Sequence, residues 1–247
     1  MRNIFLEISY NGAGYHGWQV QDNAVTVQQV LQDAIYSVFQ KRENIIGCSR
    51  TDSGVHANIF CCNFRTESNI PIDKIPDALN ANLPRDIVVL SSKEVPLEFH
   101  SRYDCIAKEY EYRILNSKKR NPFRDGLCWF YPYDLDEKLM NEECKVFIGM
   151  YDFSAFCASK SSVEDKTRTI YDFSVRREND DVIFTVKGNG FLYNMVRIMV
   201  GTLVDISRGK IEKDSIRNII LSLDRDRAGV TAPPEGLYLN RVFYDEV

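Results

Sequence analysis

The stretch Ser49-Arg50-Thr51-Asp52-Ser53-Gly54-Val55-His56 lies between two apolar segments, at 44–48 and 59–65, that are typical of strands. Aspartate, serine and glycine favour a tight turn, so the stretch predicts a strand-turn-strand unit. That turn holds the Asp52 carboxylate two residues from the Arg50 guanidinium. A carboxylate presented beside a cation is suited to nucleophilic chemistry, and we expect the functional site here.

Two other interpretations of this turn have to be weighed. Asp52-Ser53-Gly54 matches the signature of aspartic proteases, in which two carboxylates share one proton. The nearby Arg50 favours an ionised carboxylate instead, and no second Asp-Ser-Gly or Asp-Thr-Gly occurs in the chain, so a protease would have to form by dimerisation. The plainer alternative is an Asx-turn that only closes a surface loop.

Length and composition indicate a folded protein. With 247 residues, 44% of them hydrophobic, the chain can bury one large core or two of about 110 to 130 residues each. No run of 18 apolar residues occurs and the N-terminus alternates as a strand does, so we expect a soluble, cytoplasmic protein that has no contact with a membrane. The net charge of -4 disfavours a nonspecific nucleic-acid coat but leaves room for a local basic groove.

The cysteines and histidines give no sign of a metal site. Seven cysteines occur without Cys-x-x-Cys spacing, and His16, His56 and His100 lie far apart in the sequence. Structural zinc sites need closely spaced pairs of such ligands. We therefore expect neither a bound metal nor disulfides.

Hydrophobic periodicity predicts two successive runs of elements. The first consists of strands at 3–10, 44–48, 59–65 and 87–95, a helix at 26–41 with a capping box at Thr26 and Gln29, and a weak helix at 73–82 interrupted by Pro76. The second consists of strands at 107–116, 169–177, 181–187 and 237–244 and helices at 134–148, 191–207 and 214–223. Residues 115–132 read as a connector or insertion.

The repeated order indicates an α+β fold built from two ferredoxin-like βαββαβ-type halves. We place the N-terminal half, which carries the aspartate turn, at 1–105 and the C-terminal half at 106–247. The two sheets are expected to join into one extended, mostly antiparallel sheet with helices on one side. A functional cleft would then lie centrally, where residues from both halves can converge.

A glycine-rich loop precedes the first helix. Gly12-Ala13-Gly14-Tyr15-His16-Gly17 has the spacing of a dinucleotide-binding fingerprint, but residues 18–25 separate it from the helix that such a fingerprint must open directly. The glycines are better explained as allowing positive φ in a loop that carries Tyr15, His16 and Trp18. Such a loop would be suited to stacking bases.

The octapeptide closely resembles the Gly-Arg-Thr-Asp-Ala-Gly-Val-His signature of the tRNA pseudouridine synthase A family, with serine at 49 and 53 where that family usually has glycine and alanine. The resemblance extends through most of the chain in a series of blocks. The blocks are Tyr10-Asn11-Gly12, Gly17-Trp18-Gln19, Asn80-Ala81-Asn82-Leu83-Pro84, Phe99-His100-Ser101-Arg102, Ala107-Lys108-Glu109-Tyr110, Asp152-Phe153-Ser154, Arg168-Thr169-Ile170, Phe191 to Arg197, and Glu235 to Leu239.

The resemblance implies the pseudouridine synthase fold and a role for particular residues. It implies Asp52 as the essential carboxylate, either a covalent nucleophile or a base at the sugar, with Tyr110 and Arg197 as its catalytic companions. Arg197 would keep Asp52 ionised, and Tyr110 would also stack on the uracil. The residues expected to bind substrate besides Tyr110 are Arg50, His56, Arg102, Arg168 and Leu237, and His100 is also nominated for substrate contact.

The implied activity is isomerisation of uridine to pseudouridine at positions 38, 39 and 40 of the tRNA anticodon stem-loop, without a cofactor or metal. Family members act as homodimers, so two copies could supply the basic groove that the acidic single chain lacks. A different class, a catalytically idle RNA-binding module on the same fold, predicts a damaged catalytic set. Asp52, Tyr110 and Arg197 are all present, which favours the enzyme.

Overall fold

The computed structural model describes residues 1–159 and 163–245. The chain forms two compact units: unit 1 comprises Met1–Ile106 with Tyr238–Val247, and unit 2 comprises Ala107–Leu237. The last strand therefore belongs to unit 1 by its contacts, although it follows unit 2 in sequence. The division into ferredoxin-like halves at 105/106 stays a prediction.

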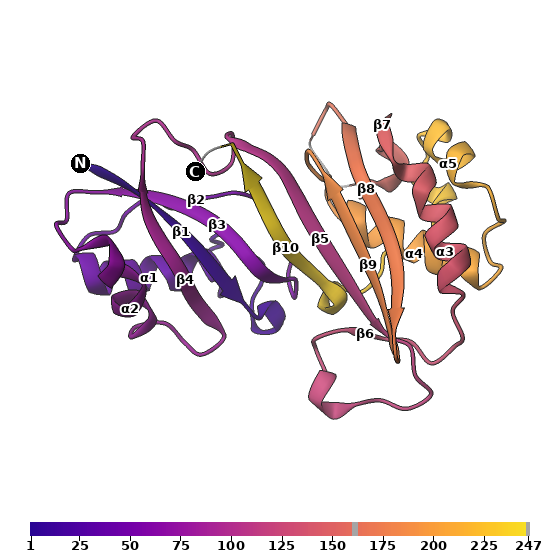
Figure 1. Cartoon of the computed structure of the whole chain (residues 1–247), viewed down its shortest axis with the longest axis horizontal. Coiled ribbons are helices and arrows are strands. Elements are labelled where there is room, and N and C mark those ends of the chain that lie inside the picture. Colours follow the sequence, from indigo (N-terminus) through magenta and orange to yellow (C-terminus); the bar gives the residue numbers. More distant parts are fainter. Residues whose placement is uncertain (160–162, 246–247) are drawn as a thin grey trace. The chain divides into compact units, whose positions relative to one another are not determined.

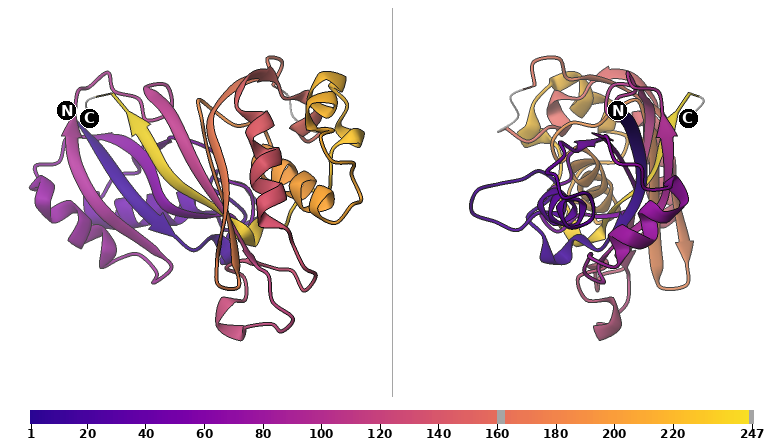
Figure 2. Two further views of the ribbon diagram at one scale, coloured as in Figure 1. Left: turned by 45° about the vertical axis from the view of Figure 1, so that its right-hand side comes forward. Right: turned by 90° about the vertical axis from the view of Figure 1, so that its left-hand side faces the viewer.

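Unit 1 is built on a mixed sheet. Its strands are β1 (Arg2–Tyr10), β2 (Ile46–Gly47), β3 (His56–Thr66), β4 (Ile87–Val95) and β10 (Leu237–Tyr244), in the order β4-β1-β3-β10 with β2 also paired to β3. The β1 strand is antiparallel to both β3 and β4, whereas β10 is parallel to β3 (Figure 1). Figure 2 shows β10, in yellow, running alongside the purple strands of this unit. This pairing places the start of β10 beside the start of β3, next to the aspartate turn.

The helices of unit 1 are α1 (Val27–Phe39) and α2 (Ile75–Asn80). The expected cap of α1 is present, because the Thr26 hydroxyl accepts a hydrogen bond from the backbone N–H of Gln29 at 3.4 Å. The expected interruption by Pro76 is wrong. Pro76 lies in the first turn of α2, just after Ile75, where its missing N–H has no intrahelical partner to lose, so it does not break the helix.

Unit 2 is built on a mostly antiparallel sheet. Its strands are β5 (Cys105–Leu115), β6 (Trp129–Phe130), β7 (Gly149–Asp152), β8 (Thr167–Glu178) and β9 (Asp181–Gly188), in the order β5-β9-β8-β7 with the short β6 parallel to β5. The predicted β8-β9 hairpin is confirmed, and Asn179 takes the positive φ of 55° that its tight turn requires.

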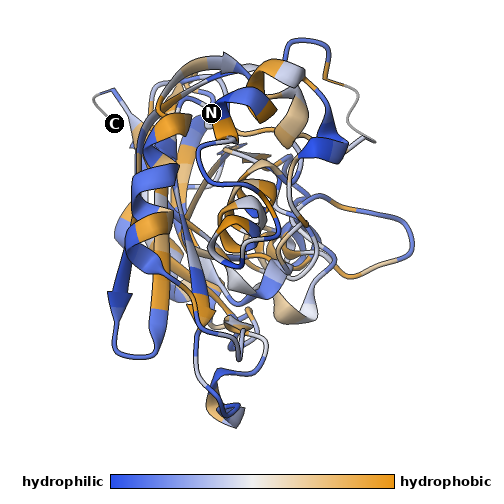
Figure 3. Cartoon of the chain, turned by 90° about the vertical axis from the view of Figure 1, so that its right-hand side faces the viewer, coloured by the Kyte–Doolittle hydropathy of each residue, from blue (hydrophilic) through white to orange (hydrophobic). Residues whose placement is uncertain are grey.

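The helices of unit 2 are α3 (Glu137–Glu143), α4 (Met195–Ser207) and α5 (Ile216–Ser222). The α4 helix is buried along nearly its whole length, as its apolar sequence predicts. Short 3-10 turns occur at Gly12–Gly14, Ile72–Lys74, Pro122–Arg124, Cys144–Phe147, Ser154–Phe156, Arg225–Arg227 and Pro234–Gly236. In Figure 3 the loops are mostly hydrophilic, whereas hydrophobic colour follows the strands and the inner helices.

The three described helices of unit 2 are all shorter than predicted, although α5 loses only two residues at its start and one at its end. The helix expected at 134–148 is α-helical only to Glu143 and then tightens into a 3-10 turn, which is common at helix ends. The helix expected from 191 begins at Met195 because Asn194 adopts a left-handed conformation with φ of 61°. A right-handed helix cannot pass through that conformation, and asparagine is one of the few residues that tolerate it.

The α+β class is confirmed: the sheets are mixed and mostly antiparallel, with helices packed on them. Both halves of the sequence also follow the βαββαβ order, first as β1-α1-β2-β3-α2-β4 and then as β5-α3-β8-β9-α4-β10 with extra elements inserted. The central cleft depends on how the units meet, and it stays a prediction. No helix among the described residues is long and apolar enough to cross a bilayer.

Candidate active site

The predicted turn at Asp52 is present and is closed by the backbone. The N–H of Val55 donates to the carbonyl of Asp52 at 3.2 Å, so Asp52 to Val55 form a four-residue turn. Gly54 has a φ of 78°, the positive value that the third position of a type II turn requires. Strand β3 starts at the next residue, so the turn sits rigidly at the end of a sheet strand. The Asp52 side chain is partly exposed there.

The glycine loop clamps this turn. The N–H of Trp18 donates to the carbonyl of Thr51 at 3.1 Å, and the N–H of Gly54 donates to the carbonyl of Tyr15 at 3.2 Å. The two loops approach so closely that a Cβ on Gly12 would lie 1.9 Å from the carbonyl oxygen of Val55, and one on Gly17 would lie 2.4 Å from that of Thr51. These glycines are therefore needed for close approach of two backbones.

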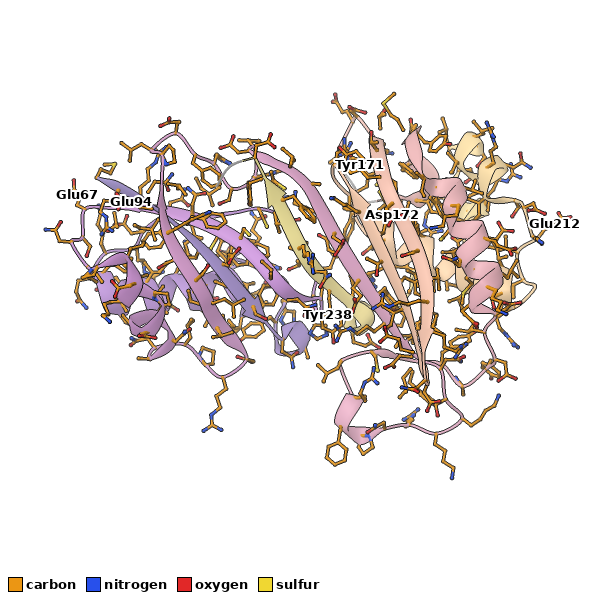
Figure 4. All side chains as sticks on the ribbon, in the orientation of Figure 1. Glu67, Glu94, Tyr171, Asp172, Glu212 and Tyr238 are labelled. Atoms are coloured by element: carbon orange, nitrogen blue, oxygen red, sulfur yellow. The ribbon has the colours of Figure 1, made fainter. Side chains whose placement is uncertain are left out.

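Side chains buried beneath the turn complete the clamp. The hydroxyls of Tyr10 and Thr51 are hydrogen-bonded at 2.9 Å. Nδ1 of His56 accepts a hydrogen bond from the backbone N–H of Gly12 at 3.0 Å. The His56 ring, only 1% exposed, stacks on Tyr238 of β10 with ring centres 4.6 Å apart; Figure 4 labels Tyr238 at the start of that strand. These contacts are structural, and the expected contact of His56 with substrate stays a prediction.

Arg50 and Arg102, which are 52 positions apart in sequence, line one pocket of unit 1. The other lining residues are Trp18, Gln19, Gln28, Ile46, Gly47, Ser49, His100 and Tyr103. Both arginines are exposed, and the turn that follows His100 carries Arg102 to the pocket. The structure thus brings two of the predicted substrate-binding residues together, and it adds Tyr103, a residue outside the predicted set.

Tyr110 lies on β5 of unit 2, opposite Val186 of β9. Its side chain is 6% exposed and meets the ring of Phe191 edge-on, with centres 5.0 Å apart. The ring is therefore oriented by the segment that leads into α4. Its catalytic role stays a prediction.

Arg197 lies in the first turn of α4. Its Nε donates to the carbonyl of Ala232 at 2.7 Å, and its Nη1 donates to the side-chain oxygen of Asn194 at 2.8 Å. The helix dipole interacts unfavourably with a cation at the N-terminus of a helix. A partly buried arginine at this position therefore lowers the stability of the folded protein, and a functional role would account for its presence. Arg197 also lies close enough to Tyr112 to oppose the rise in the pKa of that phenol, which burial raises well above its usual value.

The other two predicted residues of unit 2 lie at strand ends. Arg168, near the start of β8, donates from Nη1 to the backbone carbonyls of Asp165 and Thr167. Leu237, 6% exposed, begins β10 directly after the 3-10 turn that ends at Gly236. Their roles in substrate binding stay predictions.

Two of the three side chains expected to stack bases, Tyr15 and Trp18, are buried, whereas His16 is exposed and its contact with a base stays a prediction. Tyr15 and Trp18 are 7% and 3% exposed, so neither ring offers an open face. The Tyr15 hydroxyl donates to Asp86 at 2.7 Å, and Trp18 stacks on Phe60 with centres 4.0 Å apart. The glycine loop is therefore hydrogen-bonded to the aspartate turn and holds it in place. Tyr10 and Thr51, which complete this support, were missed because a buried tyrosine on a strand has the same sequence signal as any core residue.

Known proteins place the chain in a family. Residues 8–104 and 144–245 match the model of a family described as tRNA pseudouridine synthase. The chain belongs to the tRNA pseudouridine synthase family. Proteins called tRNA pseudouridine synthase A from Thermoanaerobacter sp. (strain X514) and Acetivibrio thermocellus are each 48% identical to this synthase over 244 residues, and one from Caldicellulosiruptor saccharolyticus is 46% identical. Each alignment covers 99% of this chain and 100% of the relative.

A more remote likeness is found to a chain in a crystal structure of a Cbf5-Nop10-Gar1 complex. That likeness has a TM-score of 0.39 at 13% identity, and it covers 95% of this synthase and 57% of that chain. Nothing about this synthase is inferred from so low a TM-score. Family membership makes this synthase an isomerase that acts on tRNA. It confirms the resemblance inferred from the octapeptide.

Proposed function

We propose that this chain converts uridines 38, 39 and 40 of the tRNA anticodon stem-loop to pseudouridine, with Asp52 as the nucleophile. The observation that carries the proposal is the clamped turn, which holds a partly exposed carboxylate at the start of β3 in a member of this family. A rigid turn favours catalysis because the nucleophile is already positioned before the substrate binds.

The reaction conserves every atom of the uridine. The bond between the anomeric carbon and N1 breaks, the uracil turns, a new bond forms from that carbon to C5, and the proton on C5 is lost while N1 gains one. Asp52 can attack the anomeric carbon and later leave it, or remove a proton from the sugar, and both routes need an ionised carboxylate.

Arg197 and Tyr110 take the supporting roles in this proposal. Arg197 supplies the positive charge that keeps Asp52 ionised, since an opposite charge within about 4 to 6 Å lowers the pKa of a carboxyl group. Hydrogen bonds to Ala232 and Asn194 fix the guanidinium within unit 2. Tyr110 stacks on the detached uracil and assists proton loss at C5, and its edge-on contact with Phe191 fixes the ring.

The test uses unmodified tRNA transcripts, the purified protein and its Asp52→Asn variant, with pseudouridine mapped at single-nucleotide resolution. Wild-type protein is expected to modify the anticodon arm, and Asp52→Asn to lose activity by about a thousandfold or more. Asp172→Asn is the matched control, because Asp172 is an exposed aspartate on β8, labelled in Figure 4.

Each outcome bears on a separate claim. Pseudouridine outside the anticodon arm would overturn the choice of target, and an active Asp52→Asn variant would overturn the role of the carboxylate. A wild-type protein that binds tRNA without modifying it would support the idle RNA-binding module instead.

The proposal includes a homodimer in the cytoplasm. A chain with a net charge of -4 can present tRNA with a larger basic surface when two copies contribute to it. Light scattering coupled to gel filtration is expected to give twice the mass of the 28.5 kDa chain. A fully active monomer would contradict the dimer. Fractionation of cells that produce the protein should place it in the cytoplasm.

A further inference from the structure

The pocket shared by Arg50 and Arg102 is small and polar. Its volume is about 210 Å³, below the roughly 300 to 1,000 Å³ of pockets that enclose drug-sized ligands. Gln19, Gln28 and Ser49 add uncharged polar groups to the wall, and none of the described lining residues has a carboxylate. A pocket of this size, lined by two arginines, suits a single anionic group such as a phosphate better than a whole cofactor.

One wall of the pocket is a stacking platform. The ring of Tyr103 stacks on His100 with centres 4.2 Å apart and planes inclined by 27°. Tyr103 is nevertheless 76% exposed, so most of its ring surface is open to solvent. An exposed tyrosine offers an aromatic face on which any of the four bases can stack once it has left its own stack.

Two arginines lie close to the Tyr103 ring. The guanidinium of Arg102 lies 6.0 Å from the centre of the Tyr103 ring, and Arg50 lies on the same pocket. Within the residues that the structure describes, neither arginine forms an ion pair with a carboxylate. Arginines without a carboxylate partner are available for phosphate, which they can bind through two parallel hydrogen bonds.

Hydrogen bonds hold the turn at residues 100–103, which carries Tyr103, in a fixed position. Nδ1 of His100 accepts hydrogen bonds from the backbone N–H groups of Arg102 and Tyr103, both at 3.2 Å. Ser101, which is fully buried, donates its N–H to Asn63 at 2.9 Å, and its carbonyl accepts from the Tyr244 hydroxyl at 2.7 Å. Because the platform is held in place before binding, little ordering entropy opposes a ligand there.

We propose that this pocket binds one unpaired nucleotide of the tRNA next to the reacting uridine, with its base on Tyr103 and its phosphate between Arg50 and Arg102. The position follows from Arg50, which is two residues from Asp52. The inference rests on tRNA being the substrate, and it is independent of which uridine is modified. It assigns Tyr103 to substrate binding and gives His100, which the sequence already nominated, the role of supporting the Tyr103 ring.

The test measures tRNA affinity and its salt dependence in the Asp52→Asn background, where no turnover interferes. Tyr103→Ala should weaken binding about 5- to 100-fold, because it removes one stacked base, whereas Tyr103→Phe should bind within about twofold of the parent. Arg102→Ala should lower the slope of log affinity against log salt by about 0.7 to 0.9, the value for one phosphate contact. The matched controls are Tyr171→Ala and Arg217→Ala, which remove an exposed tyrosine and an exposed arginine of unit 2.

Photo-crosslinking locates the contact directly. Transcripts containing 4-thiouridine should crosslink to the tryptic peptide 103–108 of the parent protein, and the crosslink should be lost in Tyr103→Ala. Equal affinity of Tyr103→Ala and its parent, or crosslinks confined to other peptides, would overturn the proposal. Loss of affinity in Tyr103→Phe as well would also count against stacking.

The two proposals fail in different measurements. If pseudouridine maps outside the anticodon arm while Tyr103→Ala still weakens binding, only the choice of target fails. If the anticodon arm is modified and Tyr103→Ala binds normally, only the pocket proposal fails. Thermal unfolding midpoints of the variants should match that of the parent, because the Tyr103 ring is mostly exposed.

Discussion

At the scale of single residues, Gly12 and Gly14 lie in the same loop but differ in what an added Cβ would meet. At Gly12 it would lie 1.9 Å from the carbonyl oxygen of Val55, and at Gly14 nothing lies within 4 Å. Gly12→Ala should therefore push the aspartate turn out of place and lower kcat at least about 100-fold, because small displacements of a reacting group are costly. Gly14→Ala should keep full activity. Equal activities of the two variants in a tRNA assay would contradict the clamp.

His56 is the second residue on which the turn depends. His56→Ala leaves the buried N–H of Gly12 without its acceptor, which should lower the free energy of unfolding by about 1 to 3 kcal/mol and reduce kcat. His56→Asn retains an acceptor oxygen and should recover part of both losses. Urea unfolding and single-turnover rates measure the two effects. If His56 contacts RNA and does not support the turn, His56→Ala would weaken tRNA binding without changing stability.

At the scale of elements, α4 positions Arg197 through its contact with the loop that follows α5. Arg197 and Gly201 are four residues apart and so lie on the same face of the helix. The loop contributes the Ala232 carbonyl to Arg197, and its Val230 carbonyl would lie 1.8 Å from a Cβ on Gly201. Contact this close between a helix and a loop is possible only with glycine on the helix.

Gly201→Ala should separate the loop from α4. We expect a loss of about 1 to 3 kcal/mol in unfolding free energy from overpacking, together with a lower kcat, because Arg197 loses its carbonyl partner. Circular dichroism should show unchanged helix content, since alanine favours helix more than glycine does. An increase in stability with normal activity would show that the loop moves without affecting Arg197.

At the scale of the whole molecule, both units bury groups that ionise in alkali. Burial raises the pKa of the Cys144 thiol in unit 2 to about 12, and it also raises the pKa of the Cys61 and Cys62 thiols in unit 1 far above the usual range. Unfolded cysteines ionise near about 8.5, so above that pH the unfolded chain releases protons that the folded chain keeps. The stabilisation is fully present below about pH 8.5 and is lost as the pH rises towards the folded values.

The urea midpoint should accordingly be level from about pH 7 to 8.5 and should fall steadily from about pH 9 to 11. Cys144→Ala is expected to be less stable than wild type at neutral pH, because it leaves a cavity, but to show a shallower alkaline decline. A midpoint that stays constant to pH 11 would contradict this assignment of buried protons.

The sequence by itself determined the local elements and the position of the aspartate turn. Strands β4 and β10 begin and end at the predicted residues, α1 has its predicted threonine cap, and Asp52 lies in the predicted turn. These features depend on periodicity, capping and turn chemistry, which act over a few neighbouring residues. The family was also evident in the sequence, because the octapeptide and the ordered blocks, apart from the one at residues 107–110, lie within the residues that match the family.

Only the tertiary structure decided which of these side chains are covered and which meet. Tyr15 and Trp18 looked available for bases and are buried, whereas Tyr103 had no distinguishing signal and is exposed beside Arg102. The convergence of Arg50 and Arg102 on one pocket depends on the turn anchored to Asn63 by Ser101. Burial and convergence result from contacts between segments far apart in the chain, and no pattern within a single segment encodes them.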